Sequence, residues 1–300
     1  MTKKKPQMTY RNETNELAAL LDVSTALSSE RETPRILDLI LEKAVENTSA
    51  DGASIYLIRT TRQDGFGGTR PTEIRTLHFL RSISRSQDIR KIKKEKFLEI
   101  DNSSIAGYVA LSGKSVNLRD CYVVSKDAPY RFDSDFDKGM GYRTKSMLAV
   151  PIKTSQGKVL GVLQLINKLR SAEDVSLGRI PEKNIIAFSI HDDRLMQAFA
   201  SQAAIALENA KLHQDISRLF ESFVTASVTA IEARDPSTSG HSDRVALMTV
   251  ELAKTVDSAQ AGPYAPVKFT PEQIQEVRYA ALLHDFGKIG VRENVLLKAN

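Results

Sequence analysis

The stretch from Ser146 to Ile166 reads SMLAVPIKTSQGKVLGVLQLI and holds two apolar runs separated by a short polar segment. The runs, 146–152 and 159–166, are rich in valine, isoleucine and leucine, and their length and bounding turn residues favour strands. Gln156-Gly157 lies between them and suits a tight turn, because glycine tolerates a positive φ. The sequence therefore predicts an antiparallel strand pair here.

Both strands and helices are predicted around this pair. Strands are predicted at 53–58, 76–80 and 115–118, where apolar side chains alternate or cluster. Helices are predicted before them, over 15–28 and from about Pro34, where apolar residues recur every three to four positions. The mixture predicts an α+β domain, an antiparallel sheet flanked by helices.

Composition limits the class of protein. Of the 300 residues, 41% are hydrophobic and 26% are charged, which is typical of a soluble globular chain long enough for two domains. The single cysteine, Cys121, cannot form an intramolecular disulfide, and no apolar run could cross a bilayer or form a signal-peptide core. We expect a cytoplasmic protein that makes no membrane contact.

The net charge of +5 comes mainly from two basic segments. One lies in residues 1–12, a polar stretch that we expect to be a disordered tail. The other is 81–96, which contains Arg90, Lys91, Lys93 and Lys94. No zinc finger, basic zipper or aromatic RNA-binding motif accompanies these segments, so we do not expect nucleic-acid binding.

A long helix is predicted over 192–233, because no proline occurs until Pro236 and no glycine until Gly240. It carries a seam whose members recur at alternating spacings of four and three: Ile205, Asn209, Leu212, Ile216, Leu219, Phe223 and Ala226. Asparagine at such a core position favours a parallel two-stranded coiled coil. We expect a parallel homodimer through this connecting helix. The alternative is an amphipathic helix that lies on its own domain.

Residues 13–213 resemble a GAF domain, in the cyclic-nucleotide-binding form found in phosphodiesterases and adenylyl cyclases. Four matching stretches follow the family's order: SIAGYV at 104–109, GMGYRTKS at 139–146, PI at 151–152 and GVLQLINK at 161–168. The family's five-residue signature is recognisable as Asn167, Lys168, Phe188, Asp192 and Asp193, with aspartate replacing the usual final glutamate.

The chemistry of the signature indicates a structural role. A lysine that ends a strand can pair with Asp192 at the start of the following helix, where a carboxylate also suits the helix dipole. We therefore expect Lys168 and Asp192 to form a brace rather than to contact a ligand.

The resemblance implies a nucleotide ligand, a purine cyclic nucleotide. Backbone amides of Ile105 and Ala106 at a helix start could meet its phosphate. By resemblance, Asp137 and Thr144 lie on the lid side of the pocket and Gln164 on the sheet floor. The alternatives are core packing for Ile105 and a strand-start hydroxyl for Thr144.

The base is left open by this comparison. Gln164 stands where some relatives have glutamate, and an amide both donates and accepts hydrogen bonds. Adenine and guanine therefore remain open, with cyclic AMP as the first expectation. Cys121 and His191 could instead indicate a redox or haem sensor, although a lone cysteine is more often a small core residue. A GAF domain without ligand, acting as a dimer scaffold, is a further alternative.

Two motifs near the end of the chain are the most specific. They are AIEARDPSTSGHSDRV at 230–245 and AALLHDFGKIGV at 280–291. They resemble the HD-GYP family, bacterial phosphodiesterases that cleave cyclic di-GMP or related cyclic dinucleotides. The resemblance implies that residues 234–300 form the first, incomplete part of an all-α HD-type domain.

The implied chemistry uses a metal. Imidazoles of His241 and His284 and the carboxylate of Asp285 suit a divalent transition metal, iron or manganese, which would polarise a phosphate and activate water. Lys288, one helical turn after His284, could neutralise phosphate charge and is the candidate catalytic residue. The alternative is that these residues only cap and brace a helix pair.

The sequence departs from the HD-GYP pattern in two ways. The 43-residue spacing between His241 and His284 is longer than usual, with a loop expected over 257–269. The chain also ends at Asn300, before the family's later histidines, aspartate and Gly-Tyr-Pro loop. We expect the 300 residues to be part of a longer enzyme and, alone, to bind metal poorly and hydrolyse little. The alternative is a non-enzymatic GAF binding or dimerisation module with a degenerate HD domain.

Overall fold

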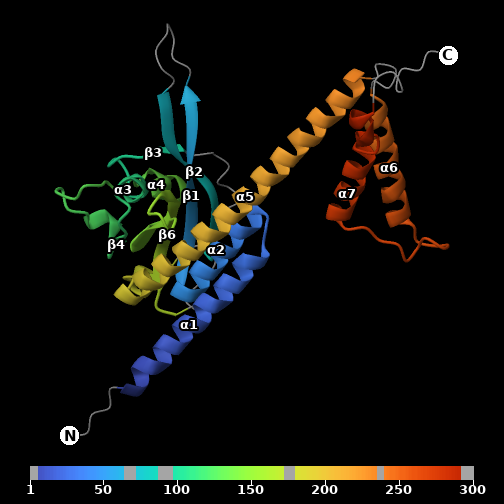
Figure 1. Ribbon diagram of the computed structural model, residues 1–300. Coiled ribbons are helices and arrows are strands. Elements are labelled where there is room, and N and C mark those ends of the chain that lie inside the picture. The colour runs from blue at the N-terminus through green and yellow to red at the C-terminus, as the bar shows by residue number, and fades with distance from the viewer. Residues whose placement is uncertain (1–5, 64–71, 87–96, 172–179, 235–239, 292–300) are drawn as a thin grey trace, which may run out of the picture. The chain divides into compact units, whose positions relative to one another are not determined.

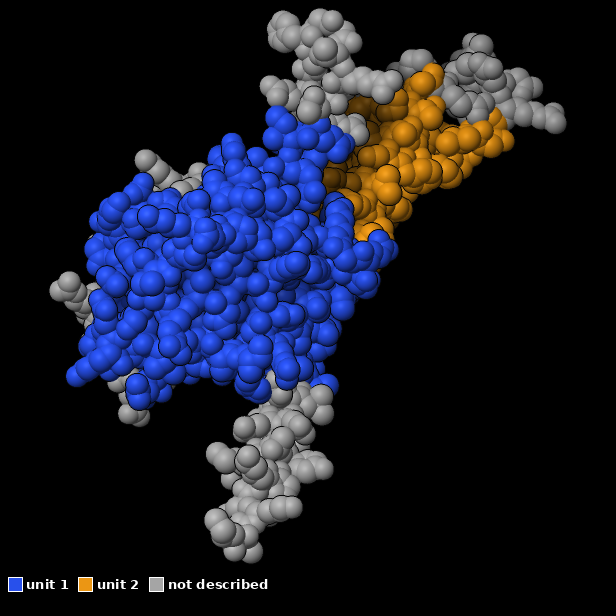
Figure 2. Space-filling model, turned by 90° about the vertical axis from the view of Figure 1, so that its left-hand side faces the viewer, with its two compact units in different colours: residues 1–211 blue, residues 212–300 orange. Residues whose placement is uncertain are grey.

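The computed structural model describes residues 6–63, 72–86, 97–171, 180–234 and 240–291 (Figure 1). It divides into two compact units, unit 1 (residues 1–211) and unit 2 (residues 212–300), which Figure 2 colours separately. No helix in the described ranges is both long and apolar enough to cross a membrane. Most of the basic segment, residues 87–96, lies outside those ranges.

Unit 1 is built on an antiparallel sheet. In the described part of the chain it has seven strands in the order β3-β2-β1-β6-β5-β4, with β7 paired to β6. The strands are β1 (Ala50–Gln63), β2 (Thr72–Ser84), β3 (Phe97–Glu99), β4 (Val116–Leu118), β5 (Met147–Lys153), β6 (Val159–Leu169) and β7 (Ile185–Ile186). The predicted pair at 146–166 is the β5–β6 hairpin, and its turn contains Gly157 with a φ of 82°.

Helices cover both faces of this sheet (Figure 1). They are α1 (Pro6–Ser29), α2 (Thr33–Thr48), α3 (Ile105–Ser112), α4 (Asp135–Met140) and α5 (Ile190–Arg234). Side chains alternate between the faces along β6: Leu163 and Leu165 join the core with α1, α2 and α5, while Val162 joins the core with α3. The predicted α+β architecture is confirmed.

Several boundaries differ from the sequence prediction. β1 and β2 extend beyond 53–58 and 76–80, because their polar, exposed ends still pair through the backbone. The helix α1 begins at Pro6, so residues 6–12 are helical rather than disordered, and proline suits a first helical position. Residues 1–5 lie outside the described ranges.

One glycine is required by close packing in the sheet. A Cβ at Gly161 of β6 would lie 2.1 Å from the Tyr56 carbonyl oxygen of β1. Any side chain there would push the two central strands apart, which explains why glycine interrupts an otherwise apolar strand.

Unit 2 contains the second part of α5, together with α6 (His241–Ser258), α7 (Pro271–Leu282) and a 3-10 helix, Phe286–Gly290. The continuous 45-residue α5 confirms the predicted long helix. A small core joins the three helices: Val224, Val228, Ala246, Ala281 and Leu282.

The seam residues of α5 lie off this core. Leu212, Ile216, Leu219 and Phe223 are all exposed, whereas Val224 and Val228 are buried. These four residues therefore do not belong to the core of unit 2.

Candidate ligand pocket and metal centre

The signature residues Lys168 and Asp192 form an ion pair between the end of β6 and the start of α5. Lys168 Nζ lies 2.5 Å from Asp192 Oδ2. The same carboxylate oxygen accepts hydrogen bonds from the Ser189 amide at 2.6 Å and the Ser189 hydroxyl at 2.7 Å. Asp192 is 3% exposed, so these partners, rather than water, stabilise its negative charge.

Asn167 holds the segment that precedes β5. Its Oδ1 accepts a hydrogen bond from the Lys145 amide at 2.7 Å, and its Nδ2 donates to the Tyr142 hydroxyl at 2.7 Å and the Arg143 carbonyl at 2.8 Å. Its φ of 52° is left-handed, a conformation that asparagine tolerates better than most residues.

The remaining signature residues also make structural contacts. Phe188 is buried in the core formed with α1, α2 and α5. The Asp193 carboxylate accepts hydrogen bonds from the Ser115 hydroxyl at 3.3 Å and the Gln197 side chain at 2.9 Å. All five signature residues thus connect elements of unit 1.

Asp137 and Thr144, expected on the lid side of the pocket, bind each other. Thr144 donates from its amide at 2.7 Å and from its hydroxyl at 2.8 Å to the Asp137 carboxylate. The Tyr122 hydroxyl donates to the same carboxylate at 2.7 Å. Partial burial and this hydrogen bond raise the pKa of Tyr122 to about 12. These contacts fix α4, which contains Asp137, against the segment that leads into β5.

A third buried carboxylate, Asp51 on β1, was missed by the sequence reasoning. It is fully buried and accepts hydrogen bonds from the Tyr142 hydroxyl at 2.6 Å and the Ser86 hydroxyl at 2.8 Å. Burial and the negative charge of Asp51 hold the pKa of Tyr142 well above its usual range. The only signal in the sequence is an aspartate at the start of an apolar strand.

Ile105 and Ala106 open α3 with their side chains buried. The Ser104 hydroxyl accepts the Gly107 amide at 3.0 Å and so caps the helix. Within the described part of the chain, no hydrogen bond engages the Ile105 and Ala106 amides, as expected for a first helical turn.

Three polar side chains lie side by side on neighbouring strands, on the face of the sheet that α3 covers. Ser54 of β1 pairs in register with Ser82 of β2 on one side and with Gln164 of β6 on the other. Their neighbours on β6, Val162 and Ile166, belong to the α3-side core, which fixes the face. We call Ser82, Ser54 and Gln164 the polar row.

The polar row has unmet hydrogen-bonding capacity. The Ser82 hydroxyl is buried and has no hydrogen-bond partner. In the described ranges the side-chain hydroxyl of Ser54 and the side-chain amide of Gln164, both half-buried, likewise make no hydrogen bond. Buried polar groups are normally satisfied, so the Ser82 hydroxyl calls for a partner, and a polar ligand or water on this face would satisfy it together with the half-buried Ser54 and Gln164. Sequence reasoning found Gln164 alone, because only the strand register brings the serines beside it.

A hollow of about 450 Å³ opens next to α4. It is lined by Cys121, Tyr122, Val124, Ser125, Lys126, Arg131, Phe132 and Ser134. None of the predicted ligand-contact residues lines it. Burial holds the pKa of the Cys121 thiol well above its usual range, which disfavours the reactive thiolate that redox sensing needs. His191 is exposed on α5.

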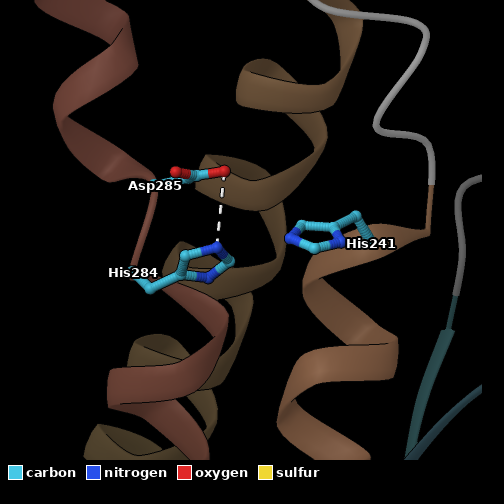
Figure 3. Close-up of side chains that lie close together, drawn as sticks. All are labelled: His241, His284 and Asp285. Carbon is cyan, nitrogen blue, oxygen red and sulfur yellow. Dashed lines mark ion pairs between the residues drawn. The ribbon is translucent and has the colours of Figure 1, made fainter.

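In unit 2 the structure brings His241, His284 and Asp285 together (Figure 3). Each offers one donor atom within 4.8 Å of the others. His241 is the first residue of α6, and His284 and Asp285 follow α7 after its C-cap residue, Leu283. Two imidazole nitrogens and a carboxylate oxygen fit a divalent transition metal.

Further contacts orient these groups. His284 Nδ1 lies 2.8 Å from the Ala281 carbonyl oxygen, so a proton on Nδ1 leaves Nε2 free to bind a metal. Lys288, the predicted catalytic residue, places its Nζ 2.7 Å from Asp285 Oδ2. This hydrogen bond is the main cause of the lowered pKa of Asp285.

Comparison with known proteins bears on unit 1. A family model described as GAF domain matches residues 32–207. A dual 3',5'-cyclic-AMP and -GMP phosphodiesterase 11 from Drosophila melanogaster is 27% identical over 214 residues, covering 70% of this chain and 13% of the fly protein. The phosphodiesterase 11A of Takifugu rubripes is 28% identical over 203 residues, covering 68% and 20%. The chain thus spans a fifth or less of these relatives.

Solved structures also resemble the chain. The GAF domain of a phosphoenolpyruvate-protein phosphotransferase from Coxiella burnetii has a TM-score of 0.47 and 16% identity, covering 68% of this chain and 99% of that one. The family match ends at residue 207, before unit 2 begins.

Proposed function

The chain belongs to the GAF domain family, and on this premise we propose that residues 13–213 bind a cyclic nucleotide and regulate a metal-dependent phosphodiesterase domain in residues 234–300. The names of the two animal relatives, phosphodiesterases of cyclic AMP and cyclic GMP, support the ligand class. The polar row is the observation that carries the proposal. It offers hydrogen-bonding partners to the edge of a purine base on an otherwise apolar face of the sheet.

A cyclic nucleotide needs donors and acceptors for its base, an apolar surface for the ring and donors for its phosphate. The hydroxyls of Ser54 and Ser82 and the amide of Gln164 supply the first. Val162 supplies apolar surface on the same face, and the Ile105 and Ala106 amides supply donors at the start of α3. Because an amide donates and accepts, cyclic AMP remains the first expectation and cyclic GMP the alternative.

In this proposal Asp137 and Thr144 lie on the lid side of the pocket and hold the lid in place. Their side chains are already joined to each other and to Tyr122. The Asp137 carboxylate already accepts three hydrogen bonds, two on Oδ2 and one on Oδ1, so about one acceptor position, on Oδ1, is left for a ligand.

Calorimetric titration with cyclic AMP and cyclic GMP tests the pocket. Replacing Gln164→Leu removes one buried hydrogen-bonding group, so affinity should fall about tenfold. Ser82→Ala should also weaken binding. The control is Gln156→Leu at the exposed β5–β6 turn, which should bind as wild type does. Unchanged affinity in both pocket variants would remove the polar row from the site.

For unit 2, the proposal is an HD-GYP-type domain in which His241, His284 and Asp285 hold iron or manganese. When bound, such a metal polarises a phosphate and lowers the pKa of bound water. Lys288 lies beside the ligand set through Asp285 and would neutralise phosphate charge. The proposed substrate is cyclic di-GMP or a related cyclic dinucleotide.

Metal titration tests this half. Cobalt(II) or manganese(II) should bind the chain measurably but weakly, as expected for a set of only three ligands, and His284→Ala should weaken binding at least about tenfold because one of the three is lost. The control, His213→Ala, alters an exposed histidine of α5 outside the triad. Absence of metal binding in wild type would favour the rival function, a non-enzymatic GAF module with a degenerate HD domain.

The seam of α5 supports a parallel homodimer as the assembled state. Leu212, Ile216 and Leu219 are exposed apolar side chains in a heptad pattern. Asn209 favours a parallel coiled coil of two helices. Ligand binding would then regulate by shifting the packing of the paired α5 helices.

A further inference from the structure

Glu232 in the last turn of α5 is tied to the residue before a metal ligand. Its Oε2 accepts a hydrogen bond from the Gly240 amide at 3.0 Å. Gly240 immediately precedes His241, the first residue of α6. Gly240 has a φ of 66°, a left-handed conformation that glycine adopts without strain. A single side chain thus fixes the backbone from which the His241 ring projects.

The other carboxylate oxygen of Glu232 is exceptional. Oε1 is buried and makes no hydrogen bond in the structure, one of two such atoms in the described residues. Val228, one helical turn earlier on the same face of α5, is 7% exposed, so water is largely excluded from this side of the helix. An unpartnered oxygen of a buried carboxylate is costly, and a nearby cation lowers that cost.

We propose that Glu232 is a positioning residue of the metal centre. It holds the Gly240 amide so that His241 meets His284 and Asp285, and its carboxylate adds negative charge at the residue that precedes His241. The inference rests on the metal centre proposed above. Because Glu232 belongs to α5, it is also the point at which a displacement of that helix reaches a metal ligand.

The geometry explains why a residue that is not a ligand would matter. His241 begins its helix, and the Gly240 N-cap offers no side chain to hold that end. The two histidine rings lie 5.3 Å apart between centroids, so a small backbone shift at Gly240 would separate the donor atoms. Groups that orient metal ligands typically change metal affinity by about 10- to 100-fold when removed.

Two variants of the full chain separate orientation from charge. Glu232→Ala removes both, so cobalt(II) affinity measured by calorimetry should fall about tenfold or more, and the visible absorption spectrum of bound cobalt should change. Glu232→Gln keeps an oxygen that accepts the Gly240 amide. It should restore the wild-type cobalt spectrum while binding more weakly than wild type, because the charge is gone.

Glu221→Ala is the matched control. Glu221 is a carboxylate on the same helix, but it accepts a hydrogen bond from the Tyr279 hydroxyl at 3.3 Å rather than from Gly240. Its loss should leave cobalt affinity and spectrum unchanged. Circular dichroism checks that each variant keeps its helices.

The outcomes are distinguishable. If wild type binds no cobalt, the metal centre itself is wrong. If wild type binds cobalt and Glu232→Ala matches it in affinity and spectrum, only the role of Glu232 is wrong. If Glu232→Ala fails to fold, Glu232→Gln decides: weaker binding with a wild-type spectrum supports the inference, and wild-type affinity overturns it.

Discussion

Lys168 Nζ lies 2.5 Å from Asp192 Oδ2, and this ion pair joins the C-terminal end of β6 to the first turn of α5. Because the side chains of Lys168 and Asp192 are only 18% and 5% exposed, water cannot replace either partner well. The long helix is therefore anchored to the sheet within its first turn.

Lys168→Met should destabilise unit 1. The change leaves a buried carboxylate that keeps only its two hydrogen bonds from Ser189, so the free energy of unfolding should fall by about 2 kcal/mol. Urea denaturation measures it. The control is Lys138→Met, which removes an exposed pair with Asp135 and should change stability by less than about 0.5 kcal/mol. Equal effects from both variants would show that Lys168 is no brace.

Tyr142→Phe should also destabilise unit 1, by about 1–3 kcal/mol. The variant removes the hydroxyl that donates to Asp51 at 2.6 Å and accepts from Asn167 at 2.7 Å. Both partners are buried and would each lose a hydrogen bond. Urea denaturation at neutral pH checks this prediction, and a loss below about 0.5 kcal/mol would contradict it.

The tyrosines predict how stability changes with pH. The folded pKa of Tyr142 is above its usual value, and burial raises that of Tyr56 to about 12. Unfolded tyrosine loses its proton near pH 10, roughly, while the folded groups keep theirs. The stabilisation is thus complete below about pH 10 and is lost as pH rises beyond it. Between roughly pH 9 and 11, the free energy of unfolding of Tyr142→Phe should fall less steeply with pH than that of wild type. Identical slopes would exclude Tyr142 as a cause of the pH dependence.

Leu219→Lys should convert the proposed dimer to a monomer. Leu219 is 71% exposed and lies in the middle of the seam, where a charge would be buried against the partner helix. Light scattering after size-exclusion chromatography measures the mass. The control, Thr225→Lys, places the same charge at an exposed position of α5 off the seam. A monomeric wild type, or a dimeric Leu219→Lys variant, would contradict the proposal.

Local patterns predicted the elements whose cause is local. The β5–β6 hairpin follows from two apolar runs around Gly157, and α5 follows from the absence of helix breakers up to Pro236. The pairing of Lys168 with Asp192 was expected from the family signature and from helix-dipole electrostatics. The triad His241, His284 and Asp285 was expected from motif resemblance, and the structure brings its donor atoms together.

Features that depend on register or long-range contact were missed. Ser54 and Ser82 join Gln164 only through pairing among three strands, which no single segment encodes. The Asp51–Tyr142 hydrogen bond spans 91 residues of sequence. Asp137 and Thr144 were predicted on the lid side of the pocket, but the hydrogen bonds between them were not, because these depend on how α4 packs.

The most direct test of the cyclic-nucleotide proposal is a melting-temperature scan of the purified chain with cyclic AMP, cyclic GMP, AMP and GMP. At a ligand concentration of about 100 times the dissociation constant, binding adds about 2.7 kcal/mol, which shifts the melting temperature of unit 1 by roughly 5–10 °C. We predict such a shift with a cyclic nucleotide and none with the linear nucleotides. No shift with any of the four, or equal shifts with cyclic and linear forms, would contradict the proposed sensor.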